Sequence, residues 1–542
     1  MAVDEFVPLD KRTVTMSLVC VALSMFLTAL SQTIIATVLP QIVAEFGGFE
    51  KYTWAVTSYM IAATVAYPIV GRLSDYYGRR FFMIVGMAIF MAGSVLVGLS
   101  ASMTHVVAFR IVQGIGGGIT MTCCYVSVAD LFPPKERGKY HGLFGAVYAV
   151  ASVAGPVLGG FIADRYAWHW AFIAIAIVGI PILALTVRVY PTHRGASGNQ
   201  RLDYPGMVAI VFAIVPVLCA LSVGGSHYEW DAFPVIGLLL FGLTMTAAFV
   251  VIESRAAWPI MPLQIYSNRM IRIAVIVTFL TSLGLYGIVI FLPLFFQVVA
   301  GLSATDSGKL LVPLLLGMVV GGIVSGQSLS RIGEHYRIQA LIGSGIMSLG
   351  IFLLTTIDEK TGVLGSGVYI VTAGFGFGWV VATFSVAVQN LVPFALVGAA
   401  TSALQFFRSA GGMLGLAVLG TVMARNFSSD FYDSLPACVK EALPRELIDE
   451  IKDNPNVLAD ADGIASVESR IPDSGSECSN LRENLFDSAA TTLAGALKDV
   501  FTIVAILVAV AFVIVAIFPV SFRSAAANGD DGDSSESNFQ EH

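Results

Sequence analysis

The stretch that decides the fold is residues 53–100, TWAVTSYMIAATVAYPIV-GRLSDYYGRR-FFMIVGMAIFMAGSVLVGLS. Its two outer parts, 53–70 and 81–100, are apolar runs, each long enough to cross about 30 Å of hydrocarbon as a helix. The ten residues between them hold two glycines, one acid and three arginines. The pattern predicts two membrane helices joined by a short charged turn.

The same alternation of apolar runs and short polar breaks continues along the whole chain. Of the 542 residues, 56% are hydrophobic and only 12% are charged, whereas soluble domains carry about 25% charged residues. We therefore expect an all-α integral membrane protein. The predicted spans are 16–39, 53–70, 81–100, 105–129, 140–162, 169–190, 204–224, 233–252, 271–296, 308–330, 337–357, 365–388, 402–425 and 499–521.

Basic residues predict the orientation, because cytoplasmic loops are enriched in lysine and arginine. One set of ends and loops is rich in these residues, as at Arg79, Arg80 and Arg137. The opposite short loops and span ends carry only Lys51, Arg165, Lys309, Lys360 and Arg425. Fourteen spans then place both termini in the cytoplasm and the acidic segment 426–498 outside. The acidic tail 526–542 has the composition of a disordered cytoplasmic segment.

Four of the six cysteines lie in apolar runs, and Cys438 and Cys478 lie in the acidic segment. Segment 426–498 faces an oxidising compartment under this topology, where the two could form a disulfide. The same segment includes a stretch, 440–452, with a helical pattern. We expect it to be a cap or partner surface, although an enzymatic role for it stays open.

The polar turn carries the first resemblance to a known family. Gly71-Arg72-Leu73-Ser74-Asp75-Tyr76-Tyr77-Gly78-Arg79-Arg80 resembles the signature G-x-L-x-D-x-x-G-R-R between the second and third spans of the major facilitator superfamily. The resemblance implies a conformational latch formed by Gly71, Asp75, Gly78, Arg79 and Arg80. A weaker echo, Gly326-Gln-Ser-Leu-Ser-Arg331-Ile-Gly333, follows the tenth span and favours two related halves.

Two further motifs extend the resemblance. Arg110-Ile-Val-Gln113-Gly114 resembles the family's R-x-x-Q-G motif, whose arginine is linked to proton coupling; the alternative is an arginine that caps backbone carbonyls. Gly155-Pro156-Val-Leu-Gly159-Gly160 resembles the G-P-x-x-G-G motif of antiporters, and it also permits close helix packing. Asp75 and Asp130, both at cytoplasmic span ends, are the other candidates for proton coupling.

The count of fourteen resembles the drug:proton antiporter branch of that superfamily. This implies six plus two plus six helices: bundles at 1–195 and at 265–425 with 499–525, joined by two linker helices in 196–264. Ser31 stands where that branch usually has an aspartate, and no acid lies deep in any predicted span. The resemblance therefore implies proton coupling, whereas the lack of an acid deep in any predicted span weakens that expectation.

Candidates for the substrate pathway are polar or aromatic groups in or near the spans, although such groups also serve as helix-packing contacts. They are Gln32, Thr33, Trp54, Tyr59, Gln113, Gln297, Gln389, Asn390, Phe407 and Arg408. Two intramembrane arginines, Arg110 and Arg408, without a deep acid favour neutral or anionic amphiphiles over cations.

These observations predict a secondary transporter that exports drug-like or amphiphilic small molecules, with protons as the exchanged ion. The alternative is a relative that exports or equilibrates one dedicated metabolite or lipid-like molecule. No phosphate-binding G-x-x-x-x-G-K-[ST] loop, metal-type spacing or catalytic motif is present, so we expect no enzyme, no cofactor, no metal and no nucleic-acid partner. We expect a monomer among membrane lipids, in the cell membrane and by preference that of a bacterium.

Overall fold

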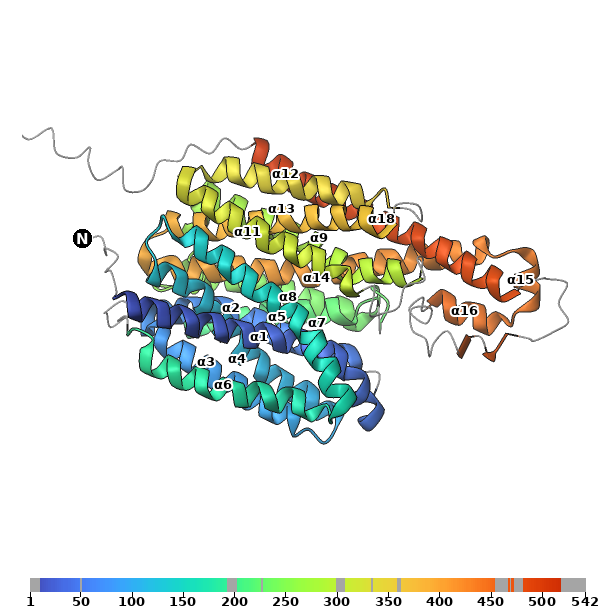
Figure 1. Cartoon of the computed structure of the whole chain (residues 1–542), viewed down its shortest axis with the longest axis horizontal. Helices are drawn as coiled ribbons and strands as arrows, with labels where there is room; N and C mark the ends of the chain where they lie inside the picture. Colours follow the sequence, from blue (N-terminus) through green and yellow to red (C-terminus); the bar gives the residue numbers. More distant parts are fainter. Residues whose placement is uncertain are drawn as a thin grey trace, which may run out of the picture.

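The computed structural model describes residues 10–48, 51–192, 202–225, 228–298, 308–332, 335–357, 362–453, 466–467, 469–471 and 481–517. Within these ranges, fourteen helices are long and apolar enough to cross a membrane, as the sequence predicted. Figure 1 shows them side by side along one direction. The basic residues predict that one end of the bundle faces the cytoplasm, and that end is called the cytoplasmic end.

The first eight long helices are α1 Lys11–Phe46, α2 Tyr52–Tyr77, α3 Arg79–Gly98, α4 Met103–Leu131, α5 Arg137–Arg165, α6 His169–Val189, α7 Tyr204–Val223 and α8 Phe233–Arg255. A short 3₁₀ helix, η2 Leu263–Ser267, leads to α9 Arg269–Val298, α11 Leu311–Ile332, α12 Tyr336–Leu354 and α13 Gly362–Leu391. After η3 Phe394–Leu396 come α14 Val397–Ser434, α15 Ala437–Ala442, α16 Arg445–Asp453 and α18 Leu481–Ile517.

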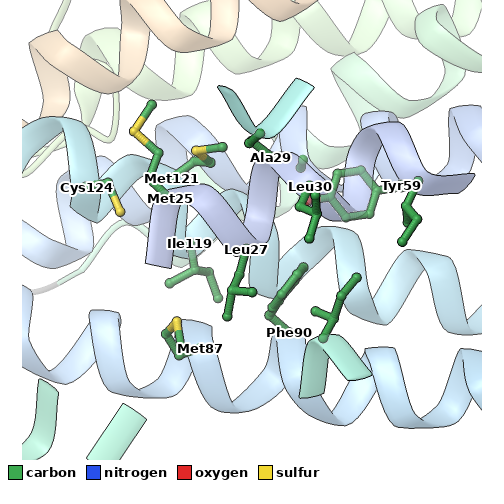
Figure 2. Packing of buried hydrophobic residues seen from close by; sticks show 14 of the residues in the cluster. Met25, Leu27, Ala29, Leu30, Tyr59, Met87, Phe90, Ile119, Met121 and Cys124 are labelled. Carbon is green, nitrogen blue, oxygen red and sulfur yellow. The ribbon is translucent and has the colours of Figure 1, made fainter. Parts of the chain in front are cut away.

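The helices pack in two groups. Helices α1 to α6 pack on one another, and α9, α11 to α14 and α18 form the second group. The first group is built around a core of large apolar side chains from α1 to α4, of which Met25, Tyr59, Met87 and Phe90 are labelled in Figure 2. Between these groups, α7 packs on its partner α8 and on α2 and α14.

The described parts of the segment 426–498 are more helical than the one stretch that the sequence predicted. Helix α14 continues nine residues into it, and α18 begins at Leu481. These extensions exist because apolar residues recur at helical spacing beyond the membrane part: Phe427 and Phe431 on α14, and Leu485 and Leu493 on α18, are all buried. In Figure 1 the extensions carry α15 and α16 beyond the end of the bundle that is opposite the N-terminus.

The stretch 440–452 is helical, as its pattern predicts, but it is divided into two helices. Two short helices, α15 and α16, occupy this part of the chain, because Pro444 has no amide hydrogen to continue the first helix and its ring disfavours helical backbone in the preceding residue. Cys438 is disulfide-bonded, and Cys478, which the sequence offered as its partner, lies outside the described residues.

Candidate functional site

The turn between α2 and α3 consists of Gly78 alone. Its φ of 89° lies in the left-handed region that favours glycine, and α3 begins at the next residue, Arg79. The side chains of Asp75 and Arg79 are therefore held on two helix ends that meet at a single residue. Both are buried, with 2% and 6% of the side chain exposed.

Asp75 binds the start of a helix in the second group. Its Oδ1 accepts the backbone N–H of Gly398 and its Oδ2 that of Ala399, both at 3.0 Å. These amides belong to the first turn of α14, where N–H groups have no partner within the helix and the helix dipole favours an anion. The carboxylate thus joins α2 to α14 across 324 positions of sequence.

Arg79 links two carboxylates. Its Nη2 donates to Asp75 Oδ1 at 2.9 Å, and its Nη1 donates to Asp130 Oδ1 at 2.5 Å. Three helices, α2, α3 and α4, therefore meet in one buried cluster. Tyr190, just after α6, borders it and shares a hydrogen bond with Ser127.

Arg80, grouped with the latch by resemblance, points elsewhere. Its Nη1 donates to Thr192 Oγ1 at 2.5 Å, and its Nη2 donates to the carbonyl of Val187. It therefore holds the end of α6, where a cation complements the helix dipole. The two consecutive arginines have different structural roles.

Arg137, at the start of α5, makes a second contact between the two groups. Its Nη1 donates to the carbonyl of Gln389 at 3.1 Å and to Asn390 Oδ1 at 2.8 Å, near the end of α13. His141 adds a hydrogen bond between its Nε2 and Gln389 Oε1 at 3.0 Å. The carboxylate of Asp75 thus binds the start of α14, and the guanidinium of Arg137 binds the end of α13. Each charge has the sign that complements the helix end it binds. The sequence pattern marked Arg137 only as a basic loop residue and did not single out His141.

Glycines bring the helix backbones together at the same end. A Cβ at Gly71 would collide with the side chain of Ser402 and lie 2.7 Å from the carbonyl of Gly398. A Cβ at Gly326 of α11 would collide with the carbonyl of Gly138 at the start of α5. The two glycine motifs that echo each other in the sequence therefore make corresponding crossings, α2 on α14 and α11 on α5.

The cytoplasmic end is closed in this structure. The contacts of Asp75 and Arg137 and both glycine crossings join the two groups there. Further along the chain, α5 separates from α11. Gly142 still packs on α11, but a Cβ at Gly145 would meet no neighbouring atom within 4 Å, and Gly155 packs on Thr33 of α1. This course of α5 can be followed in Figure 1.

Arg110 is 1% exposed and binds backbone rather than an acid. Its Nε donates to the carbonyl of Ala55 at 3.1 Å, and its Nη1 donates to Gln113 Oε1 at 2.7 Å. Its guanidinium carbon stands 4.4 Å from the centre of the Tyr59 ring. This geometry is that of the carbonyl-capping alternative, and it also satisfies Gln113, whose amide donates to Ser94.

Mid-span, the two groups meet through polar side chains. Thr64 of α2 and Ser409 of α14 share a hydrogen bond of 2.5 Å. The adjacent Arg408 is half-buried, and its guanidinium carbon lies 5.7 Å from the centre of the Tyr125 ring on α4. Among the described residues it forms no salt bridge. A cation without a salt-bridge partner among the described residues therefore stands where the two groups meet.

The antiporter-type motif of α5 packs on α1. Gly155 faces the side chain of Thr33, and Gly159 faces those of Thr37 and Ile34. Pro156 lies inside the helix on its exposed side, and a Cβ at Gly160 would find open space. The motif therefore makes the α1–α5 contact that lies opposite the cytoplasmic crossing of α5 with α11.

Four of the remaining pathway candidates lie in three places. Gln32 accepts a hydrogen bond from Tyr148 of α5 at 3.2 Å, whereas the hydroxyl of Thr33 binds carbonyls of its own helix and of α5. Trp54 packs against the linker helices α7 and α8 rather than between the two groups. Phe407 packs beside Phe406 with apolar residues of α7 and α9.

Gln297 lies near the end of α9, half-buried. In the described part of the chain, no group of three or more histidine, cysteine or acidic residues is placed to hold a metal ion.

Comparison with known proteins agrees with this architecture. The family model of the Major Facilitator Superfamily matches residues 21–416. Multidrug transporter protein MdtP of Bacillus subtilis (strain 168) is 37% identical over 79% of this chain and 80% of its own length. Multidrug resistance protein 3 of the same organism is 35% identical over 76% and 80%, and the MFS-type efflux pump LUC4 of Fusarium sp is 33% identical over 74% and 72%.

Among solved structures, the human organic anion transporter MFSD10 (TETRAN) matches with a TM-score of 0.58 and 14% identity, over 91% of this chain and 99% of that chain. The proton:xylose symporter XylE matches with a TM-score of 0.55 and 15% identity, over 77% and 90%. Both show the same fold. The chain belongs to the Major Facilitator Superfamily and is a membrane transporter of that family.

Proposed function

We propose that this protein exports drug-like or amphiphilic small molecules by alternating access, in exchange for protons. The observation that carries the proposal is the closed cytoplasmic end, held by Asp75 on the first turn of α14. A contact made of a few directed bonds and two glycine crossings forms or breaks as a unit, which is what rigid rocking of two groups requires. The relatives named as multidrug transporters support the substrate class.

The two groups and the linker pair support a division into six, two and six helices, with bundles at 1–195 and at 265–425 with 499–525 around linker helices in 196–264. In this division the substrate passes between the groups at mid-span. Arg408, Tyr125 and Gln32 are the side chains that we assign to its wall. Asp75, which Arg79 links to Asp130, is the latch at the cytoplasmic end.

The charges on this wall favour neutral or anionic amphiphiles. Arg408 is a cation without a salt-bridge partner among the described residues, and Arg110 binds carbonyls and Gln113. An anionic or polar group of a substrate would find a charge-assisted donor there. Transport of quaternary ammonium cations alone would contradict this assignment.

A second candidate function is export of one dedicated metabolite without proton exchange. It is favoured by the absence of an acid at mid-span among the described helices, since a proton-coupled carrier needs a titratable group whose exposure alternates. We assign the protein to a cell membrane, by preference a bacterial one, as a monomer without enzymatic activity.

Transport by the purified protein in proteoliposomes distinguishes these functions. If the protein exports drugs in exchange for protons, a proton gradient should drive accumulation of an amphiphile. Movement of the amphiphile in one direction should move protons in the other, and the pH of the lumen should change accordingly. Asp75→Asn is expected to reduce this transport severely while the protein still inserts. Accumulation that is indifferent to the gradient would favour the dedicated exporter.

A further inference from the structure

Asp203 and Glu253 form a buried pair of carboxyl groups that the latch does not include. Asp203 precedes α7 and caps it: its Oδ1 accepts the N–H of Gly206 at 2.9 Å. Glu253 lies in the last turn of α8, and its Oε1 accepts the N–H of Met261. The two residues are 8% and 2% exposed, so both carboxyl groups are removed from water.

The remaining oxygens of the pair face each other without a donor. Asp203 Oδ2 and Glu253 Oε2 are buried and have no hydrogen-bond partner among the described residues. A Cβ at Gly206 would collide with Asp203 Oδ2 and lie 3.1 Å from Glu253 Oε2, so both oxygens border the same point. A single proton between them would satisfy both.

Among the residues that the structure describes, neither carboxyl group forms a salt bridge. Arg72 of α2 interacts electrostatically with Glu253, but its guanidinium lies 4.1 Å from the centre of the Trp258 ring and donates to the carbonyl of Ala395 at 3.3 Å. From η2, the hydroxyl of Tyr266 faces this region with no hydrogen-bond partner among the described residues. Two like charges so close in a buried site do not both form.

We propose that Asp203 and Glu253 form a protonation site on the linker helices, which holds one proton while the cytoplasmic end is closed. The inference rests on the proposed function for its role, since it names residues that release a proton to the cytoplasm during export. Arg72 connects this site to the latch, because it interacts electrostatically with both Asp75 and Glu253.

Loss of the proton would change the contact between the two groups. A doubly ionised pair attracts Arg72, and this attraction competes with its hydrogen bond to Ala395, which precedes α14 in the second group. Opening of the cytoplasmic end exposes the pair to water, which stabilises the second charge. Proton release and opening are thereby coupled.

Difference infrared spectroscopy of the full-length protein in lipid nanodiscs tests the site. The wild type is expected to show the carbonyl stretch of a protonated carboxylic acid at neutral pH and to lose it as the pH rises. Glu253→Gln should lack this titrating band, and Asp203→Asn should change the pH at which the band disappears. Both variants keep the native acceptors, because glutamine still accepts from Met261 and asparagine caps a helix as well as aspartate. Glu229→Gln, in the exposed loop before α8, is the matched control and should keep the band.

A band that persists unchanged in Glu253→Gln, or a wild type without one, overturns the proposal. A bound metal cation is the competing occupant. If sodium or magnesium chloride raises the thermal unfolding midpoint of the wild type above that in choline chloride, and Glu253→Gln abolishes the difference, the pair holds a cation and the protonation site is wrong. Neither measurement requires transport, so each outcome is independent of the export assay.

The coupling is tested with spin labels at Tyr77→Cys on α2 and Ile338→Cys on α12, two exposed positions at the cytoplasmic end. The long-distance population should grow with pH in the wild-type background and stay constant with Glu253→Gln. An equal pH response in both backgrounds would overturn the link to opening.

Discussion

Replacing Asp75 by asparagine should open the cytoplasmic end. The carboxylate accepts two N–H groups of α14 and the guanidinium of Arg79. Asparagine has one acceptor oxygen, so one N–H of α14 loses its partner and faces an amide N–H₂ instead. Arg79 keeps Asp130, so the variant does not strand a buried charge and should fold.

The magnitude follows from these contacts. A hydrogen bond to a charged group contributes about 1.5–3 kcal/mol, and an anion at a helix start about 0.3–1 kcal/mol. Losing one such bond and the charge costs about 3 kcal/mol. Because each 1.4 kcal/mol changes an equilibrium about tenfold, the ratio of closed to open cytoplasmic ends should fall roughly a hundredfold.

The assay is the distance distribution between labels at Tyr77→Cys and Ile338→Cys, in a background with Cys219→Ser. Cys20, Cys123 and Cys124 are buried, and Cys438 is disulfide-bonded. Asp75→Asn should shift most molecules to the longer distance. Asp231→Asn, an exposed aspartate before α8, is the matched control and should leave the distribution unchanged. A distribution for Asp75→Asn identical to that of the wild type would refute the latch.

Three other changes follow from the same contacts. Gly326→Val should abolish transport without preventing insertion, because its side chain would meet the carbonyl of Gly138, whereas Gly160→Ala, with open space at its Cβ, should transport normally; equal activity of the two would contradict the crossing. Arg110→Lys should lower the thermal unfolding midpoint, since one ammonium cannot replace the guanidinium bonds to Ala55 and Gln113, at about 1–3 kcal/mol for each buried partner left unpaired. Cys438→Ser should lower the stability by about 2–4 kcal/mol in oxidising buffer only, and an equal loss with dithiothreitol would exclude the disulfide as the cause.

Local pattern was enough to predict the membrane fold and to single out Asp75, whose role as a latch stays a prediction. The apolar runs set the fourteen spans, and the spacing of Gly71, Asp75 and Gly78 placed an acid at a helix end. What Asp75 binds was beyond the sequence, because the amides of Gly398 and Ala399 lie more than 320 positions away and come close only through the packing of α2 on α14.

The same limit explains what was missed. Arg137 follows two prolines at the start of a span, and nothing local distinguishes it from other positive-inside residues; its partners lie about 250 positions away on α13. Asp203 and Glu253 read as ordinary polar ends of spans until α7 and α8 are packed together. The helical extensions of α14 and α18 left a signal, the four-residue spacing of Leu481, Leu485, Ala489 and Leu493, which a search for long apolar runs passes over.

The most direct test of the central claim is proton movement by the reconstituted protein when an amphiphile is supplied. In proteoliposomes with a proton gradient, the account predicts accumulation of a neutral or anionic amphiphile together with dissipation of the gradient. A protonophore and Asp75→Asn should each abolish both signals. Accumulation that continues at the same rate with the gradient collapsed, and without any change of internal pH, would contradict proton-coupled export.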